Sequence, residues 1–353
     1  MLTDSQSGAR ESSTVEARPV AVSPVDLAED PQAQAGFQTL LTGCGVYPLS
    51  HRSKIILTGE DRTRWLNGMV TNNIRDLAAG QGVYAFLLNP QGRIQGDLYA
   101  FNRADSIVLD VESEQAAKLL EILDHYIVMD DVQVEDAANR YSGLGVQGPQ
   151  AAAVLEAAGF ALPHLALLQF VDLEWNGVTV TVVRAEVWKG SAYEIWLAPE
   201  HAPVLLNALR QAGAVEVGAG AQRLYRIASG IPQFGEDIRE RDLPQETGQE
   251  RALHFAKGCY VGQEIVERIR SRGQVHRVFS GLELTAPATP GDKITADDKD
   301  VGEITSVATF AMPEGPKMVA LGYLRREAFL KALTVHGAPV QRRELPFHEI
   351  LQH

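Results

Sequence analysis

The sequence predicts an α+β protein that ends in a separate all-β segment. Between residues 53 and 213, β-type runs alternate with helical runs, and some β-type runs adjoin as hairpins. After about residue 276, the pattern changes to short strands broken by Gly, Pro and Asp, which is typical of a small antiparallel barrel or sandwich. The length of 353 residues suits two or three domains rather than one core.

The first alternation contains four strands and two helices. Residues 53–59 (SKIILTG) are a short apolar run closed by glycine, which predicts a strand, and residues 60–77 carry apolar side chains at helical spacing. Residues 82–103 predict two strands joined by the turn NPQG. A further strand over 106–111 and a helix over 113–128 complete this part.

A second alternation follows the first. Residues 132–148 are strand-like, and 148–159 predict a helix with proline in its first turn and glycine at its end. The runs 178–186 and 192–198 alternate as strands do, and 199–213 predict a helix.

These patterns divide the chain into three parts. Residues 1–34 have few large apolar side chains and cannot offset the entropy of ordering, so we expect a flexible arm. Part of residues 24–49 can turn helical as the folded region begins. We place an α+β region over 35–276, with two subdomains divided near residue 135, and a β-barrel over 277–353.

Charge and hydropathy limit the classes of partner. The formal net charge is −13, so no overall basic footprint for nucleic acid exists, and we expect no direct nucleic-acid partner. One local basic strip, ERIRSRGQVHR (267–277), is either a solvated helix face or a patch for an anionic tail, a protein or nucleic acid. With no apolar run of about 18 residues and no signal-peptide pattern, we expect a cytoplasmic protein without a membrane partner.

The two cysteines, Cys44 and Cys259, are too few for a disulfide framework and indicate a reducing compartment. They form no C-x-x-C pair, so no self-contained metal or iron–sulfur site is expected.

The stretch KGCYVGQE (257–264) is the most distinctive in the chain. A thiol becomes nucleophilic as thiolate, and cations or a helix N-terminus lower its pKa. Lys257 precedes Cys259 by two residues, and a helix is predicted to begin at Gly262. Cys259 is therefore either an activated thiol or a small buried apolar side chain.

KGCYVGQE resembles the K-G-C-Y-x-G-Q-E signature of the YgfZ family. These folate-binding proteins act in iron–sulfur cluster assembly and repair, and are related in fold to aminomethyltransferase, the T-protein of the glycine cleavage system. Other stretches resemble family patterns in the same order: LTGEDRTRWLNGMVTNNIRDLAAG, YAFLLNPQGRIQGDL, LGVQGPQAAAVL, VGEITSV and ALGYLRRE. The resemblance extends from about residue 38 to about residue 345.

The resemblance implies two α+β units around a central channel, completed by the C-terminal barrel, with tetrahydrofolate or another reduced folate in the channel. Asp97 matches a carboxylate of the T-protein hairpin that can assist proton transfer near the folate; otherwise it only flanks a turn. Tyr84 either contacts the ligand or packs in the core.

One departure from the T-protein pattern concerns recognition of the pterin. T-proteins carry R-L-E-A-G, whereas this chain has Ala228 at the glutamate position. A pterin edge presents neighbouring N–H donors that suit a carboxylate. Either Glu236, Asp237 or Glu246 substitutes for the missing acid, or folate binds differently or weakly.

The sequence thus yields a definite set of candidate residues. The candidate catalytic residues are Cys259 and Asp97, and the candidate folate-binding residues are Tyr84, Asp97, Glu246, Lys257, Gln263 and Arg268, with no metal ligands.

The predicted function is that of a folate-binding accessory protein whose partners are iron–sulfur client or assembly proteins. Cys259 would ligate a cluster transiently with a partner's thiols, exchange disulfides, or be structural. The alternatives are a folate-dependent aminomethyltransferase and an interaction module that has lost its ligand.

Overall fold

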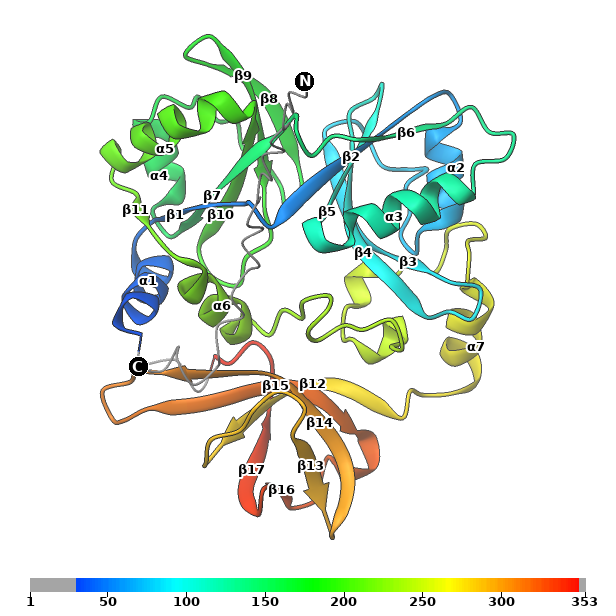
Figure 1. The fold of residues 1–353 in the computed structure, drawn as a ribbon, viewed down its shortest axis with the longest axis vertical. Coiled ribbons are helices and arrows are strands. Elements are labelled where there is room, and N and C mark those ends of the chain that lie inside the picture. Colours follow the sequence, from blue (N-terminus) through cyan, green and yellow to red (C-terminus); the bar gives the residue numbers. More distant parts are fainter. Residues whose placement is uncertain (1–29, 349–353) are drawn as a thin grey trace, which may run out of the picture.

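The computed structural model describes residues 30–348, which form two α+β units and a closed β-barrel (Figure 1). The two units lie side by side, and the barrel packs below them, with helix α6 and the loop that follows it in between. This arrangement confirms the predicted α+β fold with a C-terminal antiparallel barrel. Residues 1–29 of the predicted arm lie outside the described residues, and helix α1 begins at Pro31.

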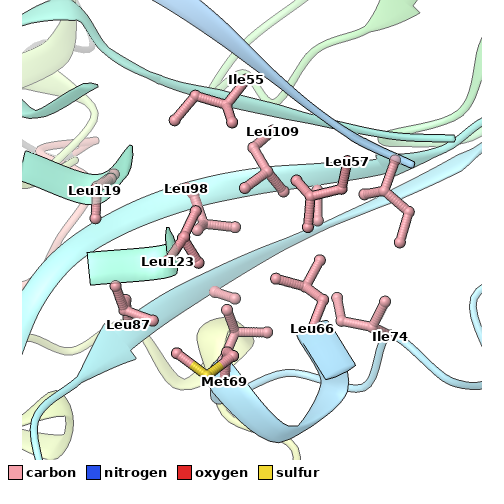
Figure 2. Packing of buried hydrophobic residues seen from close by; sticks show 14 of the residues in the cluster. Ile55, Leu57, Leu66, Met69, Ile74, Leu87, Leu98, Leu109, Leu119 and Leu123 are labelled. Carbon is pink, nitrogen blue, oxygen red and sulfur yellow. The ribbon is translucent and has the colours of Figure 1, made fainter. Parts of the chain in front are cut away.

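The first unit is an antiparallel sheet with the strand order β3-β4-β5-β2-β6. Its elements are β2 (Arg52–Thr58), α2 (Arg62–Met69), β3 (Gln81–Leu88), β4 (Ile94–Asn102), β5 (Ile107–Glu112), α3 (Ser113–His125) and β6 (Gln133–Asp136). Figure 2 shows the core of this unit, where Leu66 and Met69 of α2 and Leu119 and Leu123 of α3 cover one face of the sheet. The pattern of alternating strand residues thus buries one face beneath the two helices.

Helix α2 is shorter than the sequence pattern predicts. The prediction of a helix over residues 60–77 is wrong in length, because α2 ends at Met69. The Lys257 ammonium donates to the carbonyl oxygens of Asn67 and Asn72 at 2.6 and 2.7 Å, and to a carbonyl between them at 2.5 Å. A lysine far along the chain therefore binds the carbonyl groups at the end of the helix, which local periodicity cannot indicate.

The second unit has a six-stranded sheet in the order β11-β1-β7-β10-β9-β8. Its elements are α1 (Pro31–Thr42), β1 (Gly45–Pro48), β7 (Ser142–Gly148), α4 (Ala151–Ala157), β8 (Phe170–Trp175), β9 (Val178–Arg184), β10 (Ser191–Leu197), η1 (Pro199–His201), α5 (Ala202–Gln211), β11 (Val215–Glu216) and α6 (Ala219–Ala228). Strand β8 has no counterpart among the predicted strands.

The chain passes between the two sheets twice. Strand β1 precedes β2 in sequence but pairs with β7, so the second unit includes a segment from before the first unit. The single strand predicted over residues 132–148 is two strands, β6 and β7, which belong to different sheets. The sheets face one another through residues such as Phe101 and Trp196, whose ring centroids are 5.1 Å apart.

The barrel closes in the order β12-β15-β14-β13-β16-β17, so it has no open sheet edge. A connecting segment with η2 (Pro244–Glu246), η3 (Glu250–Ala252) and α7 (Gln263–Arg272) leads into it. The barrel elements are β12 (Arg277–Leu284), β13 (Lys293–Ala296), β14 (Lys299–Phe310), β15 (Lys317–Arg325), η4 (Arg326–Ala328), β16 (Leu333–Val335) and β17 (Ala338–Arg343). Within residues 30–348, no helix is both long and apolar enough to cross a membrane.

Candidate functional site

A cavity of about 390 Å³ lies where the second unit, the segment after α6 and the barrel meet. Its lining residues are Glu186, Val187, Trp188, Ser229, Gly230, Ile231, Thr247, Gly248, Gln249, Arg251, Phe279, Leu345 and Pro346. Two aromatic side chains and several aliphatic ones form most of the wall, and one acid and one base supply charge. A cavity of this size and lining suits a small organic molecule with a flat ring and a few polar groups.

At the charged end of the cavity, Glu186 forms a hydrogen-bonded network with Tyr99 and Arg251. The Tyr99 hydroxyl donates to Glu186 Oε2 at 2.8 Å, and the Arg251 guanidinium bonds to the same oxygen. Burial raises the pKa of Tyr99 well above its usual range, so the phenol stays protonated and keeps donating. The Arg251 guanidinium also lies 4.2 Å from the centre of the Tyr84 ring. Arg251 therefore connects the cavity to the first sheet.

Asp97 lies next to this network on β4. The Tyr84 hydroxyl donates to Asp97 Oδ2 at 2.7 Å, and Gln115 Nε2 donates to Oδ1 at 2.7 Å. A Cβ at Gly96 would lie 2.6 Å from Gln115 Oε1, so glycine allows this close approach. The structure thus brings Tyr84 and Asp97 together, while Asp97 reaches the cavity lining only through Tyr84 and Arg251. A carboxylate held by two donors can accept or return a proton if a ligand approaches.

The segment around Cys259 forms a different part of the surface. The Cys259 side chain is exposed and does not line the cavity. Its neighbours are fixed: Tyr260 is buried in the same hydrophobic cluster as Tyr84, and Gly262 adopts φ 81°. A Cβ at Gly262 would lie 2.5 Å from the carbonyl oxygen of Asn89 in the β3–β4 turn. The exposed thiol is therefore carried by a segment whose neighbouring residues, Tyr260 and Gly262, are closely packed.

None of the six predicted folate-binding residues lines the cavity, although Tyr84 contacts the lining residue Arg251. Lys257 is buried, its ammonium bonds three carbonyl groups at the end of α2, and burial lowers its pKa to about 7. Glu246 Oε2 lies 3.1 Å from the Arg277 guanidinium. Gln263 accepts a bond from the backbone near its own helix start, and Arg268 is exposed on α7. The structure does not bring Lys257, Glu246, Gln263 or Arg268 to the cavity, since each is used within the protein or points to solvent.

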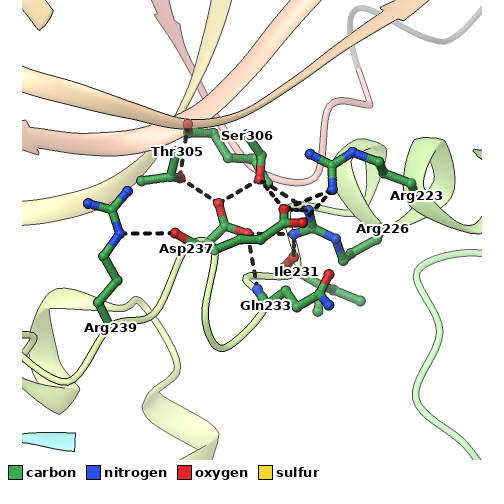
Figure 3. Close-up of polar contacts among 10 residues, drawn as sticks. Arg223, Arg226, Ile231, Gln233, Asp237, Arg239, Thr305 and Ser306 are labelled. Atoms are coloured by element: carbon green, nitrogen blue, oxygen red, sulfur yellow. Dashed lines mark hydrogen bonds and ion pairs between the residues drawn. The ribbon is translucent and has the colours of Figure 1, made fainter. Parts of the chain in front are cut away.

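The three acids considered as substitutes for the missing glutamate are paired elsewhere. Figure 3 shows Asp237 beneath the barrel, where it is fully buried and bonds Arg226 at 2.5 Å and Ser306 at 2.8 Å. Glu236 pairs with the same arginine at 3.0 Å. With Glu246 bound to Arg277, all three acids hold the segment after α6 against the barrel. Each of the three acids therefore has an arginine partner, and none of them lines the cavity; that one of them substitutes for the missing glutamate stays a prediction.

Sequence reasoning missed Glu186 and Gln115. Glu186 follows the end of β9, and its local sequence RAEVWKG carries no motif. Gln115 lies in the first turn of α3, where it resembles an ordinary helix-start residue. Gln115 gains its partner Asp97 from the packing of α3 on β4, and Glu186 gains Tyr99 from the packing of the second unit against the first. Among residues 30–348, no cluster of three or more His, Cys, Asp or Glu side chains is arranged to hold a metal ion.

The fold recurs in a protein of known structure. The glycine cleavage system aminomethyltransferase T from Bartonella henselae superposes with a TM-score of 0.80 at 22% identity, covering 89% of this chain and 89% of that one. This likeness establishes the aminomethyltransferase fold. Residues 18–257 match the GCVT N-terminal domain, and the chain belongs to that family.

Curated relatives agree with this assignment. A putative chloroplastic transferase of Arabidopsis thaliana is 26% identical over 288 residues, covering 81% of this chain and 66% of that protein, just under two thirds of its length. Aminomethyltransferases from Rubrobacter xylanophilus and a Picosynechococcus species are each 28% identical; they cover 89% and 82% of this chain, and 83% and 81% of their own lengths. The relationship to aminomethyltransferases is thus shown, and membership of the YgfZ family stays a prediction from residues 257–264.

Proposed function

We propose that this protein binds a reduced folate, tetrahydrofolate in the first instance, in the cavity between the second unit and the barrel. The observation that carries the proposal is the composition of that cavity. Trp188 and Phe279 supply aromatic surface for a flat ring, and Glu186 and Arg251 supply charge at one end. Kinship with aminomethyltransferases supports folate as the ligand class.

In this proposal, Asp97 accepts or donates a proton once the bound folate has displaced Arg251, which together with Tyr84 separates Asp97 from the cavity. Its two oxygens are held by Tyr84 and Gln115, which orient the carboxylate without neutralising it. Arg251 lies over the Tyr84 ring and lines the cavity, so a ligand that moves Arg251 would alter the surroundings of Asp97. Asp97 would then accept a proton from a reacting amine, or return one.

The finer proposal is that the protein is an accessory in iron–sulfur cluster assembly or repair, and that Cys259 is its working thiol. The signature KGCYVGQE and the exposure of Cys259 support this role. The second cysteine, Cys44, is buried, and burial raises its pKa to about 11, so it is not a competing thiolate. A single accessible thiol cannot hold a cluster alone, so partner proteins would supply the remaining ligands.

The second candidate is aminomethyl or other one-carbon transfer to folate. The names of the relatives favour it, and they support it more directly than they support the iron–sulfur role. Asp97 would be the proton-transfer residue of such a reaction.

Three measurements test these proposals. Calorimetry with tetrahydrofolate should give saturable binding; absence of binding to any reduced folate would favour a ligand-free interaction module. Incubation with tetrahydrofolate and an aminomethylated donor, followed by assay for 5,10-methylenetetrahydrofolate, tests the transferase. If no product forms, and a deletion strain loses activity of its [4Fe–4S] enzymes, the accessory role is supported; undiminished [4Fe–4S] activity would contradict it.

A further inference from the structure

Glu186 is the one acidic side chain in the lining of the cavity, and half of its carboxylate is uncommitted. Its side chain is 18% exposed, so it is accessible to a molecule in the cavity. Both protein donors, the Tyr99 hydroxyl and the Arg251 guanidinium, bond to Oε2. Within the described part of the chain, no hydrogen bond reaches Oε1.

The two bonds to Oε2 give Glu186 a fixed orientation. Tyr99 belongs to β4 of the first unit, whereas Arg251 lies in η3 of the connecting segment, so two separate parts of the fold hold one oxygen. The remaining oxygen keeps its acceptor capacity. A carboxylate arranged in this way is a preorganised acceptor for an N–H group.

The other lining residues indicate the shape of the ligand that would carry this N–H group. Trp188 follows Glu186 by two residues and lines the same cavity, as does Phe279 of the barrel. Aromatic and aliphatic walls favour a flat ring system over a chain of charged groups. An acceptor oxygen at the end of such a slot suits a heterocycle with an amino group or ring N–H on its edge.

We propose that Glu186 Oε1 accepts an N–H of the amide-like edge of the pterin ring, and that this contact makes the cavity select an amino-substituted pteridine. The inference rests on the proposed binding of a reduced folate and assigns the residue that recognises it. Ala228 supplies no acceptor side chain, and Glu236 and Asp237 are bound to arginines. Glu186 therefore takes the acceptor role within this cavity.

The test compares two ligands and two proteins. Calorimetry measures the affinity of wild type and Glu186→Gln for tetrahydrofolate, and for its analogue with hydrogen in place of the 2-amino group. A charged acceptor is expected to contribute about 10- to 100-fold in affinity. Wild type should therefore bind the analogue about 10- to 100-fold more weakly, and Glu186→Gln should lose a similar factor for tetrahydrofolate and no longer distinguish the two ligands.

Two controls separate recognition from structure. Glu236→Gln changes an acid that does not line the cavity, and it should retain wild-type affinity and preference. The pterin-free fragment p-aminobenzoylglutamate should bind wild type and Glu186→Gln equally; weaker binding to the variant would mean a structural role and overturn the inference.

The outcomes distinguish a failure of the Glu186 inference from a failure of the proposed folate binding. If wild type binds both folates equally, Glu186 does not recognise the amino edge, and the inference is overturned while folate binding stands. If wild type binds neither ligand, the proposed function itself fails. The comparison of the two ligands on wild type still tests whether the cavity recognises the 2-amino group, even if Glu186→Gln does not fold.

Discussion

Replacement of Gly262 by alanine tests whether the stability of the protein depends on the close approach of the backbone near Cys259 to the β3–β4 turn. Gly262 has φ 81°, which costs an alanine roughly 1 kcal/mol. An added Cβ would lie 2.5 Å from the carbonyl oxygen of Asn89 and 3.1 Å from Gly92 Cα. Both are backbone atoms, so the β3–β4 turn must move, at a cost of about 1–3 kcal/mol. The expected loss of unfolding free energy is therefore about 2–4 kcal/mol for Gly262→Ala.

The matched control is Gly213→Ala. Gly213 also has a positive φ, 103°, but no atom lies within 4 Å of its added Cβ. Its substitution should cost only the backbone strain, roughly 1 kcal/mol. Urea unfolding followed by circular dichroism gives both values. Equal losses in the two variants would refute the steric argument, because backbone strain alone would then account for Gly262.

Three further predictions address the thiol, the acid and pH. Cys259→Ser should melt within about 2 °C of wild type, since the side chain is exposed, but fail to complement a deletion strain; equal complementation would make Cys259 structural. Asp97→Asn should weaken reduced-folate binding about 10-fold by calorimetry, whereas unchanged affinity would remove Asp97 from the site. Burial raises the pKa of Glu303, but bonds from Lys293 and Arg239 outweigh this and bring it to about 2. Since this folded-state pKa lies below the usual 4.5, the stabilisation is complete above pH 4.5 and lost as pH falls toward 2. Glu303→Gln should therefore be about 1–2 kcal/mol less stable than wild type at pH 6, with the difference vanishing near pH 2 in urea titrations; a constant difference would contradict the assignment.

The hairpin and the barrel were predictable because their signals are local. The turn NPQG lies between two alternating runs, and β3 and β4 flank it as expected. The glycine-rich short strands after residue 276 likewise predict a barrel. In the hairpin the two paired strands are consecutive, so turn chemistry and alternation are sufficient. In the barrel the same signals indicate the strands but not their order, because β12 pairs with β15 and β17, which come after β13 and β14.

The end of α2 and the partner of β1 were not predictable from local patterns. Periodicity extended the helix past Met69, and nothing near residue 69 indicates that Lys257 bonds its terminal carbonyl groups. Strand β1 lies next to β2 in sequence but pairs with β7 and β11. Both outcomes depend on contacts between residues about 100 to 190 positions apart.

The sequence by itself determined the fold class, the family resemblance and the identity of the distinctive thiol segment, because alternation, turns and an eight-residue signature are written in consecutive residues. Tertiary structure alone decided which charged groups are free. Asp237 and Glu246 are equivalent to Glu186 as isolated carboxylates, and each of the three has an arginine partner. Arg226 of α6 binds Asp237, Arg277 of the barrel binds Glu246, and Arg251 binds Glu186 through one oxygen, which leaves the other oxygen of Glu186 available. Whether an acid holds the fold or faces a ligand depends on which distant donors reach it, and only the packing of the three parts sets those distances.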